Sequence, residues 1–179
     1  MNSDPATPGP DRVLNFAYGS NMCSRRLRAR VASAQPLGIG RLVGYRLAWH
    51  KRGRDGTGKC DLVATGAPED TVWGVLFAIA RAQKPLLDAA EGLGRGYREQ
   101  TLSIVSGGAA IAAFAYLATD IDAALRPFGW YHALVAAGAA EHGLPLAYRQ
   151  QIDAVATLAD PDRERAQLHF ALARGEPHA

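Results

Sequence analysis

The stretch Tyr18-Gly19-Ser20-Asn21 combines a backbone turn with side chains that could bind a small polar group. Apolar residues alternate over 13–18 and predict a short strand, which Gly19 then breaks. Ser20 or Asn21 can cap a following helix that runs to about Val31. A strand, a glycine turn and a helix N-terminus aim backbone N–H groups at one point, which suits a carboxylate or a phosphate. The alternative is an ordinary capped strand-to-helix turn.

Glu91 is the acid that we single out for proton transfer. It ends a predicted helix over 80–91, follows Ala89 and Ala90, and precedes a glycine loop. If these small apolar residues bury the carboxyl group, desolvation and the helix macrodipole both raise its affinity for a proton. Such a group can take a proton and give it back. The alternative is a surface glutamate near a helix end. Tyr97 and Tyr131 are candidate hydroxyl donors nearby, although most tyrosines are core or rim residues.

Other site classes find little support in the sequence. The five histidines and two cysteines have no spacing typical of metal ligands, so we expect neither a metal nor another cofactor. Ser20 does not lie in G-x-S-x-G, which argues against an acyl-serine hydrolase. The glycines of 38–44 lack the dinucleotide-binding spacing, and the polar loop 51–59 lacks the pattern of a phosphate-binding loop.

The predicted order of elements places several strands before most of the helices, which favours an α+β fold. We expect 61–66 and 71–79 to pair as a hairpin, and 98–105 to pair with 109–119 across a Ser-Gly-Gly turn. Beyond the segments already named, strand character extends over 38–49, and helices are predicted over 130–142, 146–156 and about 160–173.

Composition describes an ordinary globular domain of 179 residues, 48% of them hydrophobic and 21% charged. We expect a disordered tail over 1–12, one domain over 13–156, and a C-terminal helix and tail over 157–179. The net charge of +3 demands no acidic partner. Arginines at 25–30 are expected to face water while Leu27 and Val31 face inward; without interleaved aromatic residues, this basic helix gives no reason to expect nucleic acid.

The compartment that we expect is the cytoplasm. Cys23 and Cys60 are too few for a disulfide framework, and both fit free thiols in a reducing environment. The polar, proline-rich start does not resemble a signal peptide. The longest apolar run, 109–118, is too short to span a bilayer. We therefore expect no membrane association, and the sequence leaves the oligomeric state open, with a homodimer as one option.

Several of these segments, in this order, resemble the γ-glutamylcyclotransferase family, and together they cover roughly residues 13 to 155. The Y-G-S-N turn by itself is moderately specific, whereas its combination with the later segments is much more so. One departure is Pro127-Phe128, where similar sequences often have Pro-Ser. The resembling segments are F-A-Y-G-S-N-M at 16–22, V-W-G-V-L-F at 72–77, L-D-A-A-E-G-L at 87–93 with Gly96-Tyr97, A-Y-L-A at 115–118, and W-Y-H-A-L-V-A-A-G-A-A-E-H-G-L-P-L-A-Y at 130–148.

The resemblance implies a small, closed or nearly closed mixed β-barrel flanked by helices, with the turn at the mouth of a cavity. It also implies an enzyme without a cofactor: the α-amine of a γ-glutamyl amide attacks its own γ-carbonyl, which releases 5-oxoproline and an amine or amino acid. Glu91 would be the general acid and base. Substrate binding would fall to Tyr18, Gly19, Ser20, Asn21, Tyr97 and Tyr131.

Two other functions remain open at this point. The domain could bind a γ-glutamyl metabolite without turning it over, in which case a ligand would bind tightly and no product would form. Alternatively, the helix that carries the arginines at 25–30 could bind nucleic acid or an acidic partner, with a steep dependence on salt. The presence of Glu91 together with the complete turn favours the enzyme.

Overall fold

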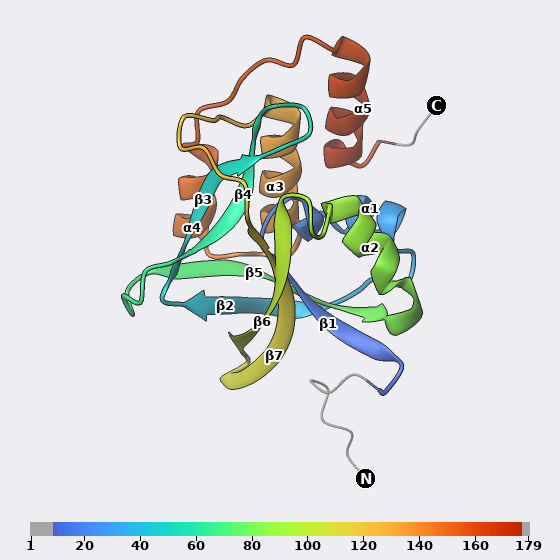
Figure 1. The fold of residues 1–179 in the computed structure, drawn as a ribbon, viewed down its shortest axis with the longest axis vertical. Helices are drawn as coiled ribbons and strands as arrows, with labels where there is room; N and C mark the ends of the chain where they lie inside the picture. Colours follow the sequence, from blue (N-terminus) through green and yellow to red (C-terminus); the bar gives the residue numbers. More distant parts are fainter. Residues whose placement is uncertain (1–8, 177–179) are drawn as a thin grey trace.

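The computed structural model describes residues 9–176, so most of the predicted tail over 1–12 lies outside the described residues, as do the last three. Five strands close a barrel in the order β1-β5-β2-β6-β7 (Figure 1). β1 pairs antiparallel with β5 and parallel with β7, and this parallel contact completes the ring. The mixed barrel flanked by helices that the resemblance implies is therefore confirmed. The barrel strands are β1 (Arg12–Ala17), β2 (Gln35–Val43), β5 (Thr71–Ala80), β6 (Tyr97–Ser106) and β7 (Ala109–Ala118).

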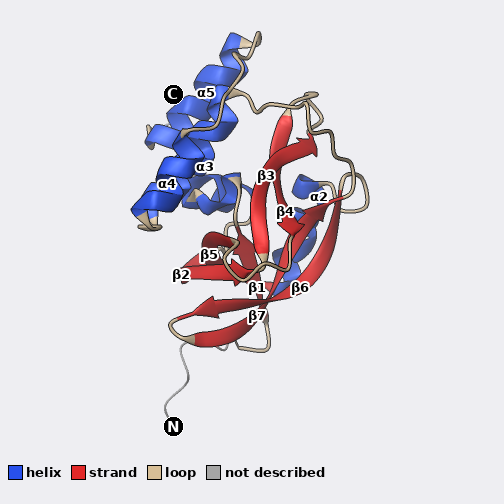
Figure 2. Cartoon of the chain, turned by 90° about the vertical axis from the view of Figure 1, so that its left-hand side faces the viewer, coloured by secondary structure: helices blue, strands red, loops and turns tan. Residues whose placement is uncertain are grey.

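A separate hairpin of β3 (Tyr45–Arg52) and β4 (Gly58–Ala64) rises from the barrel toward the helices (Figure 2). The predicted pairing of 61–66 with 71–79 is wrong, because β4 pairs with β3 and β5 pairs with β1 and β2. Gly44, at φ +80°, turns the chain between β2 and β3 and divides the predicted strand 38–49 in two. The polar loop is also shorter than predicted, since both its ends belong to strands.

The helices lie where the sequence places them, and most of them are shorter than predicted. α3, α4 and α5 gather on one side of the barrel, whereas α1 and α2 lie on another (Figure 1). Gly92, at φ +74°, ends α2 as predicted. No helix within residues 9–176 is long and apolar enough to cross a bilayer. The helices are α1 (Ser24–Arg30), α2 (Lys84–Glu91), α3 (Gly129–Glu141), α4 (Leu146–Asp153) and α5 (Arg163–Arg174).

Close packing of α3 on the chain after Gly19 fixes the approach of the helical layer to the barrel. A Cβ atom on Gly138 would lie 2.3 Å from the backbone nitrogen of Cys23 and 2.6 Å from Cβ of Met22. Met22, Cys23 and Leu134 are fully buried in this contact region. Only glycine at position 138 lets the two backbones approach this closely, so the sequence of α3 sets the position of the turn.

The last helix, α5, packs on α3, and a stacked aromatic pair lies in this contact. The ring of His169 stacks on Trp130 with 4.2 Å between the centroids. Trp130 Nε1 donates a hydrogen bond to Asp160 at 2.7 Å, just before α5 begins. Burial lowers the pKa of His169 to about 4, and the positive charges of Arg26, Arg30 and Arg165 act in the same direction. The stacked imidazole is therefore neutral at pH 7.

This docking predicts a specific loss of stability in acid. The folded-state pKa of His169 lies below the ordinary value of 6.5, so its contribution to folding is present above pH 6.5 and is lost as the pH falls toward 4. We expect His169→Phe, which keeps an aromatic ring on Trp130, to flatten this part of the stability profile. Urea unfolding of both proteins between pH 7 and pH 4 measures it. Parallel profiles would show that His169 titrates normally.

Candidate active site

The chain after β1 makes a tighter turn than the sequence predicts. A 3₁₀ turn over Ser20–Met22 follows Gly19, and α1 begins only at Ser24, with Cys23 as the preceding residue. Neither Ser20 nor Asn21 therefore caps the helix. Gly19 has φ −116°, so its backbone does not require a left-handed conformation. It instead allows a close approach, because a Cβ atom there would lie 3.0 Å from Cβ of Cys60 and 3.2 Å from the hydroxyl of Tyr131.

All seven residues that the resemblance assigns to the site line one small inner pocket. They come from the first turn, the end of α2, the start of β6 and the start of α3. Within residues 9–176, the backbone N–H groups of Gly19, Ser20 and Asn21 donate no hydrogen bond. The inner pocket therefore combines free donors, an acid and aromatic walls. Its lining residues are Asn15, Phe16, Ala17, Tyr18, Gly19, Ser20, Asn21, Cys60, Glu91, Tyr97, Tyr116 and Tyr131.

Two of the tyrosines are held by the backbone of Cys60. Tyr97 donates its hydroxyl to the Cys60 carbonyl oxygen at 2.7 Å, and the Cys60 N–H donates to the Tyr131 hydroxyl oxygen at 3.0 Å. Burial raises the pKa of both phenols well above the ordinary value, so both stay neutral. Because Tyr131 accepts the bond from Cys60, its own hydroxyl proton remains available to a ligand in the pocket.

Cys60 itself is not a nucleophile at neutral pH. Its side chain is fully buried, and burial raises the pKa of the thiol to about 12. The reactive form of cysteine is the thiolate, which such a thiol does not populate near pH 7. A covalent thioester route therefore finds no support at this position. Among residues 9–176, no three His, Cys, Asp or Glu side chains form a group that could hold a metal ion.

Glu91 is surrounded by polar partners and not by the small apolar residues that the sequence indicated. Ala89 and Ala90 are exposed. Asn21 Nδ2 donates to Glu91 Oε1 at 2.9 Å, and Arg30 pairs with the same oxygen. Arg30 also donates to Asn21 Oδ1 at 2.9 Å, which closes a three-membered network. Charge-assisted hydrogen bonds of this kind fix the carboxylate in one orientation.

The orientation of α1 corrects a second expectation, that its arginines face water. Arg26 and Arg30 are both partly buried and turn toward Glu91, whereas Arg25 and Arg28 are exposed. Residues four apart share a face of a helix, so the spacing of Arg26 and Arg30 is the signal that could have indicated their common direction. Arg25 donates to the backbone carbonyls of Leu172 and Ala173 at the end of α5. The four arginines thus do not form one exposed basic face.

An outer chamber of about 210 Å³ opens on the other side of Glu91. It shares Ser20, Glu91, Tyr97 and Tyr131 with the inner pocket, so a ligand can extend from one into the other. Sequence reasoning missed its basic residues, which include Lys51 at the end of β3. Phe128, the departure from the family pattern, is not among the residues that line either space; its ring lies under Lys59 and Arg165.

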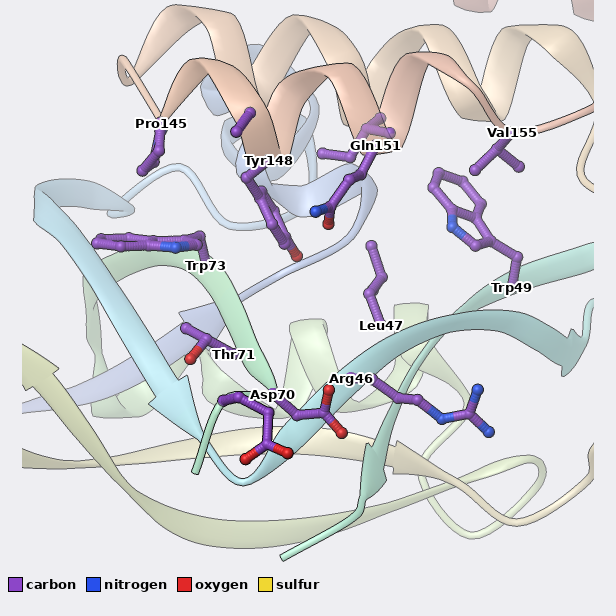
Figure 3. A pocket seen from close by; sticks show the side chains of 13 residues that line it. Arg46, Leu47, Trp49, Asp70, Thr71, Trp73, Pro145, Tyr148, Gln151 and Val155 are labelled. Atoms are coloured by element: carbon purple, nitrogen blue, oxygen red, sulfur yellow. The ribbon is translucent and has the colours of Figure 1, made fainter. Parts of the chain in front are cut away.

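A larger groove of about 490 Å³ lies elsewhere, between α4 and the strands β3 and β5. Tyr148 points from α4 into it between Trp73 and Leu47 (Figure 3). None of the site residues indicated by the sequence lines this groove. Its size does not make it the reaction site, because the acid, the free N–H donors and the tyrosine hydroxyls converge in the smaller inner pocket.

Comparisons with known proteins agree with this geometry. The AIG2-like family matches residues 71–152. Human γ-glutamylcyclotransferase is 31% identical over 157 residues, which cover 85% of this chain and 83% of the relative. The bovine γ-glutamylcyclotransferase is 30% identical over 151 residues, which cover 81% of this chain and 79% of the relative. A solved structure of a γ-glutamyl cyclotransferase superposes with a TM-score of 0.77 at 25% identity, covering 88% of this chain and 99% of that one.

The buried state of Cys60 gives a chemical test of the pocket. A thiol reagent such as iodoacetamide reacts with thiolate, so we expect no alkylation of Cys60 in the folded protein at pH 8. Both Cys60 and Cys23 should react after unfolding in guanidinium chloride, which controls for the reagent. Mass spectrometry of the peptides gives the site of labelling. Rapid alkylation of Cys60 in the folded protein would contradict a closed, high-pKa thiol.

Proposed function

The chain belongs to the γ-glutamylcyclotransferase family, and we propose that it opens γ-glutamyl amides with Glu91 as general acid and base. The α-amine nitrogen of the substrate forms a bond with its own γ-carbonyl carbon. The bond from that carbon to the amide nitrogen breaks. The products are 5-oxoproline and the released amine or amino acid, and neither metal nor nucleotide takes part in this scheme.

The observation that carries the proposal is the position of Glu91. Its carboxylate stands where the inner pocket and the outer chamber meet. Within residues 9–176, the carboxylate accepts hydrogen bonds from Asn21 and Arg30, and both are made to Oε1. The other oxygen, Oε2, is therefore the one that a substrate would meet. A held carboxylate with one available oxygen at a junction of two spaces suits proton transfer between two nitrogens of one substrate.

The proton inventory of the reaction requires one group that works in both directions. An α-ammonium must lose a proton before it attacks, and the leaving nitrogen must gain one before it departs. The attacking nitrogen also loses a second proton once its bond to the carbonyl carbon has formed, and the released amine gains a second proton when it becomes an ammonium. Glu91 can carry both protons in turn on Oε2, so no net proton is consumed. Because nucleophile and carbonyl belong to one molecule, correct positioning can supply much of the barrier reduction, up to about 7–11 kcal/mol for well-oriented intramolecular reactions.

The inner pocket supplies the groups that hold the γ-glutamyl part. The N–H groups of Gly19, Ser20 and Asn21 would bind the substrate α-carboxylate. Asn15, which the sequence did not indicate, lines the same pocket and is 2% exposed. Its Nδ2 donates to the Phe114 carbonyl, whereas its buried Oδ1 has no partner within residues 9–176. We assign this oxygen to the substrate α-amino group, because an unpaired buried acceptor is costly and an amine would satisfy it.

A reducing cellular compartment fits this chemistry. Cys23 and Cys60 are both free and buried, which supports a cytoplasmic location for an enzyme that acts on small metabolites.

Replacing Glu91 tests the proposal directly. We expect Glu91→Gln to lower kcat for 5-oxoproline release by about a hundredfold or more, within the range for loss of a general acid–base. The amide keeps the size of the side chain and can still contact Arg30 and Asn21. The assay uses a panel of γ-glutamyl amino acids and γ-glutamyl amines, with 5-oxoproline measured by mass spectrometry. Glu69→Gln, an exposed acid on the far groove, serves as the matched control.

Two results would contradict this function. Near-normal kcat in Glu91→Gln would remove Glu91 from its role. A folded parent protein that binds γ-glutamyl compounds but releases no 5-oxoproline from any of them would favour a binding module without turnover.

A further inference from the structure

The outer chamber is strongly basic, and its positive charge indicates which leaving amines it can bind. Six basic side chains line it, against the two acids Glu91 and Asp55. Under the proposed function, on which this inference rests, the γ-glutamyl part occupies the inner pocket and the leaving amine extends into the chamber. The basic residues are Arg26, Arg30, Lys51, Arg54, Lys59 and Arg165.

Three of the six cations are neutralised within the protein. Arg30 pairs with Glu91. Lys59 Nζ lies 2.8 Å from Asp55 Oδ2, and also contacts the hydroxyl of Thr57 at 2.7 Å. Arg165 makes a two-pronged contact with Asp160, at 2.5 and 2.7 Å. These three cations need no further partner, although they still contribute to the positive potential of the chamber.

Lys51, Arg26 and Arg54 form no salt bridge with any carboxylate of residues 9–176. Lys51 is only 7% exposed, and its Nζ lies 4.6 Å from the centre of the Tyr97 ring. The Nε atom of Arg26 is buried without a hydrogen-bond partner. Burial lowers the pKa of Lys51 and lowers that of Arg26 to about 10. Arg54, in contrast, is exposed. Covered, unpaired cations such as Lys51 and Arg26 are costly in a folded protein, and a bound anion removes that cost.

We propose that the leaving amine carries a second anionic group besides its α-carboxylate, so that the substrate class is γ-glutamyl derivatives of acidic amino acids. The α-carboxylate of a neutral amino acid can neutralise only one of the three unpaired cations. The side-chain carboxylate of glutamate or aspartate can neutralise a second of these cations. Charges that are partly withdrawn from water interact more strongly than exposed pairs, so the preference should be large enough to measure.

The test compares γ-glutamyl-glutamate with γ-glutamyl-glutamine, which match in size and differ by one carboxylate. We expect kcat/KM for 5-oxoproline release to be about tenfold higher for the acidic substrate at pH 7.5. Lys51→Met and Arg54→Met, each of which removes one unpaired charge, should reduce this ratio. Arg46→Met removes an exposed charge from the same strand as Lys51, outside the chamber, and should leave the ratio unchanged. Thermal unfolding confirms that each variant is folded.

The outcomes separate this inference from the proposed function. Equal kcat/KM for the two substrates would overturn the inference while cyclotransferase activity stands. A preference that survives in both Lys51→Met and Arg54→Met would also overturn it, because the preference would then have another origin. If the folded parent released 5-oxoproline from neither of these substrates and from no other member of the panel, the proposed function would be overturned and this inference with it.

Discussion

The hydrogen-bonded network of Asn21, Arg30 and Glu91 ties the turn after β1 and the adjacent helix α1 to the end of α2, which lies 61 to 70 residues further along the chain. Asn21 comes from the turn after β1, Arg30 from the last residue of α1, and Glu91 from the last residue of α2. One charged oxygen is shared by two donors, so displacement of any of these elements would leave a partly buried charge or amide without its partner. The position of the proposed acid therefore depends on the turn and both helix ends at once.

The barrel and the helical layer supply the rigidity that this network needs. The parallel contact of β1 with β7 closes the barrel and leaves the turn at its rim. Gly138 brings α3 against Met22 and Cys23 from the other side. The Cys60 backbone then joins Tyr97 of β6 to Tyr131 of α3. A reaction whose nucleophile lies within the substrate needs positioning above all, and the tyrosine walls also limit the access of water.

The sequence predicts what depends on neighbouring residues and misses what depends on distant ones. Strand 71–79, the hairpin of 98–119 and the end of α2 at Gly92 follow from local periodicity and glycine chemistry, and the structure confirms them. The pairing of β4 with β3, in place of β5, is a choice between distant partners that alternation alone does not contain. The polar surroundings of Glu91 could not be predicted either, because Arg30, which contacts it, lies 61 residues earlier in the sequence. The order of the family motifs, and not periodicity, predicted the barrel. The same motifs predicted that residues 18–21 and Glu91 share one site.

The central claim is that the substrate's own amine, and not water, opens the amide. The most direct measurement is turnover of a γ-glutamyl amino acid in water enriched in ¹⁸O, with the products analysed by mass spectrometry. Intramolecular attack predicts 5-oxoproline without ¹⁸O, because the carbonyl oxygen of the substrate is retained. Release of glutamate with one ¹⁸O in its γ-carboxylate would show that water opened the amide and would contradict the claim.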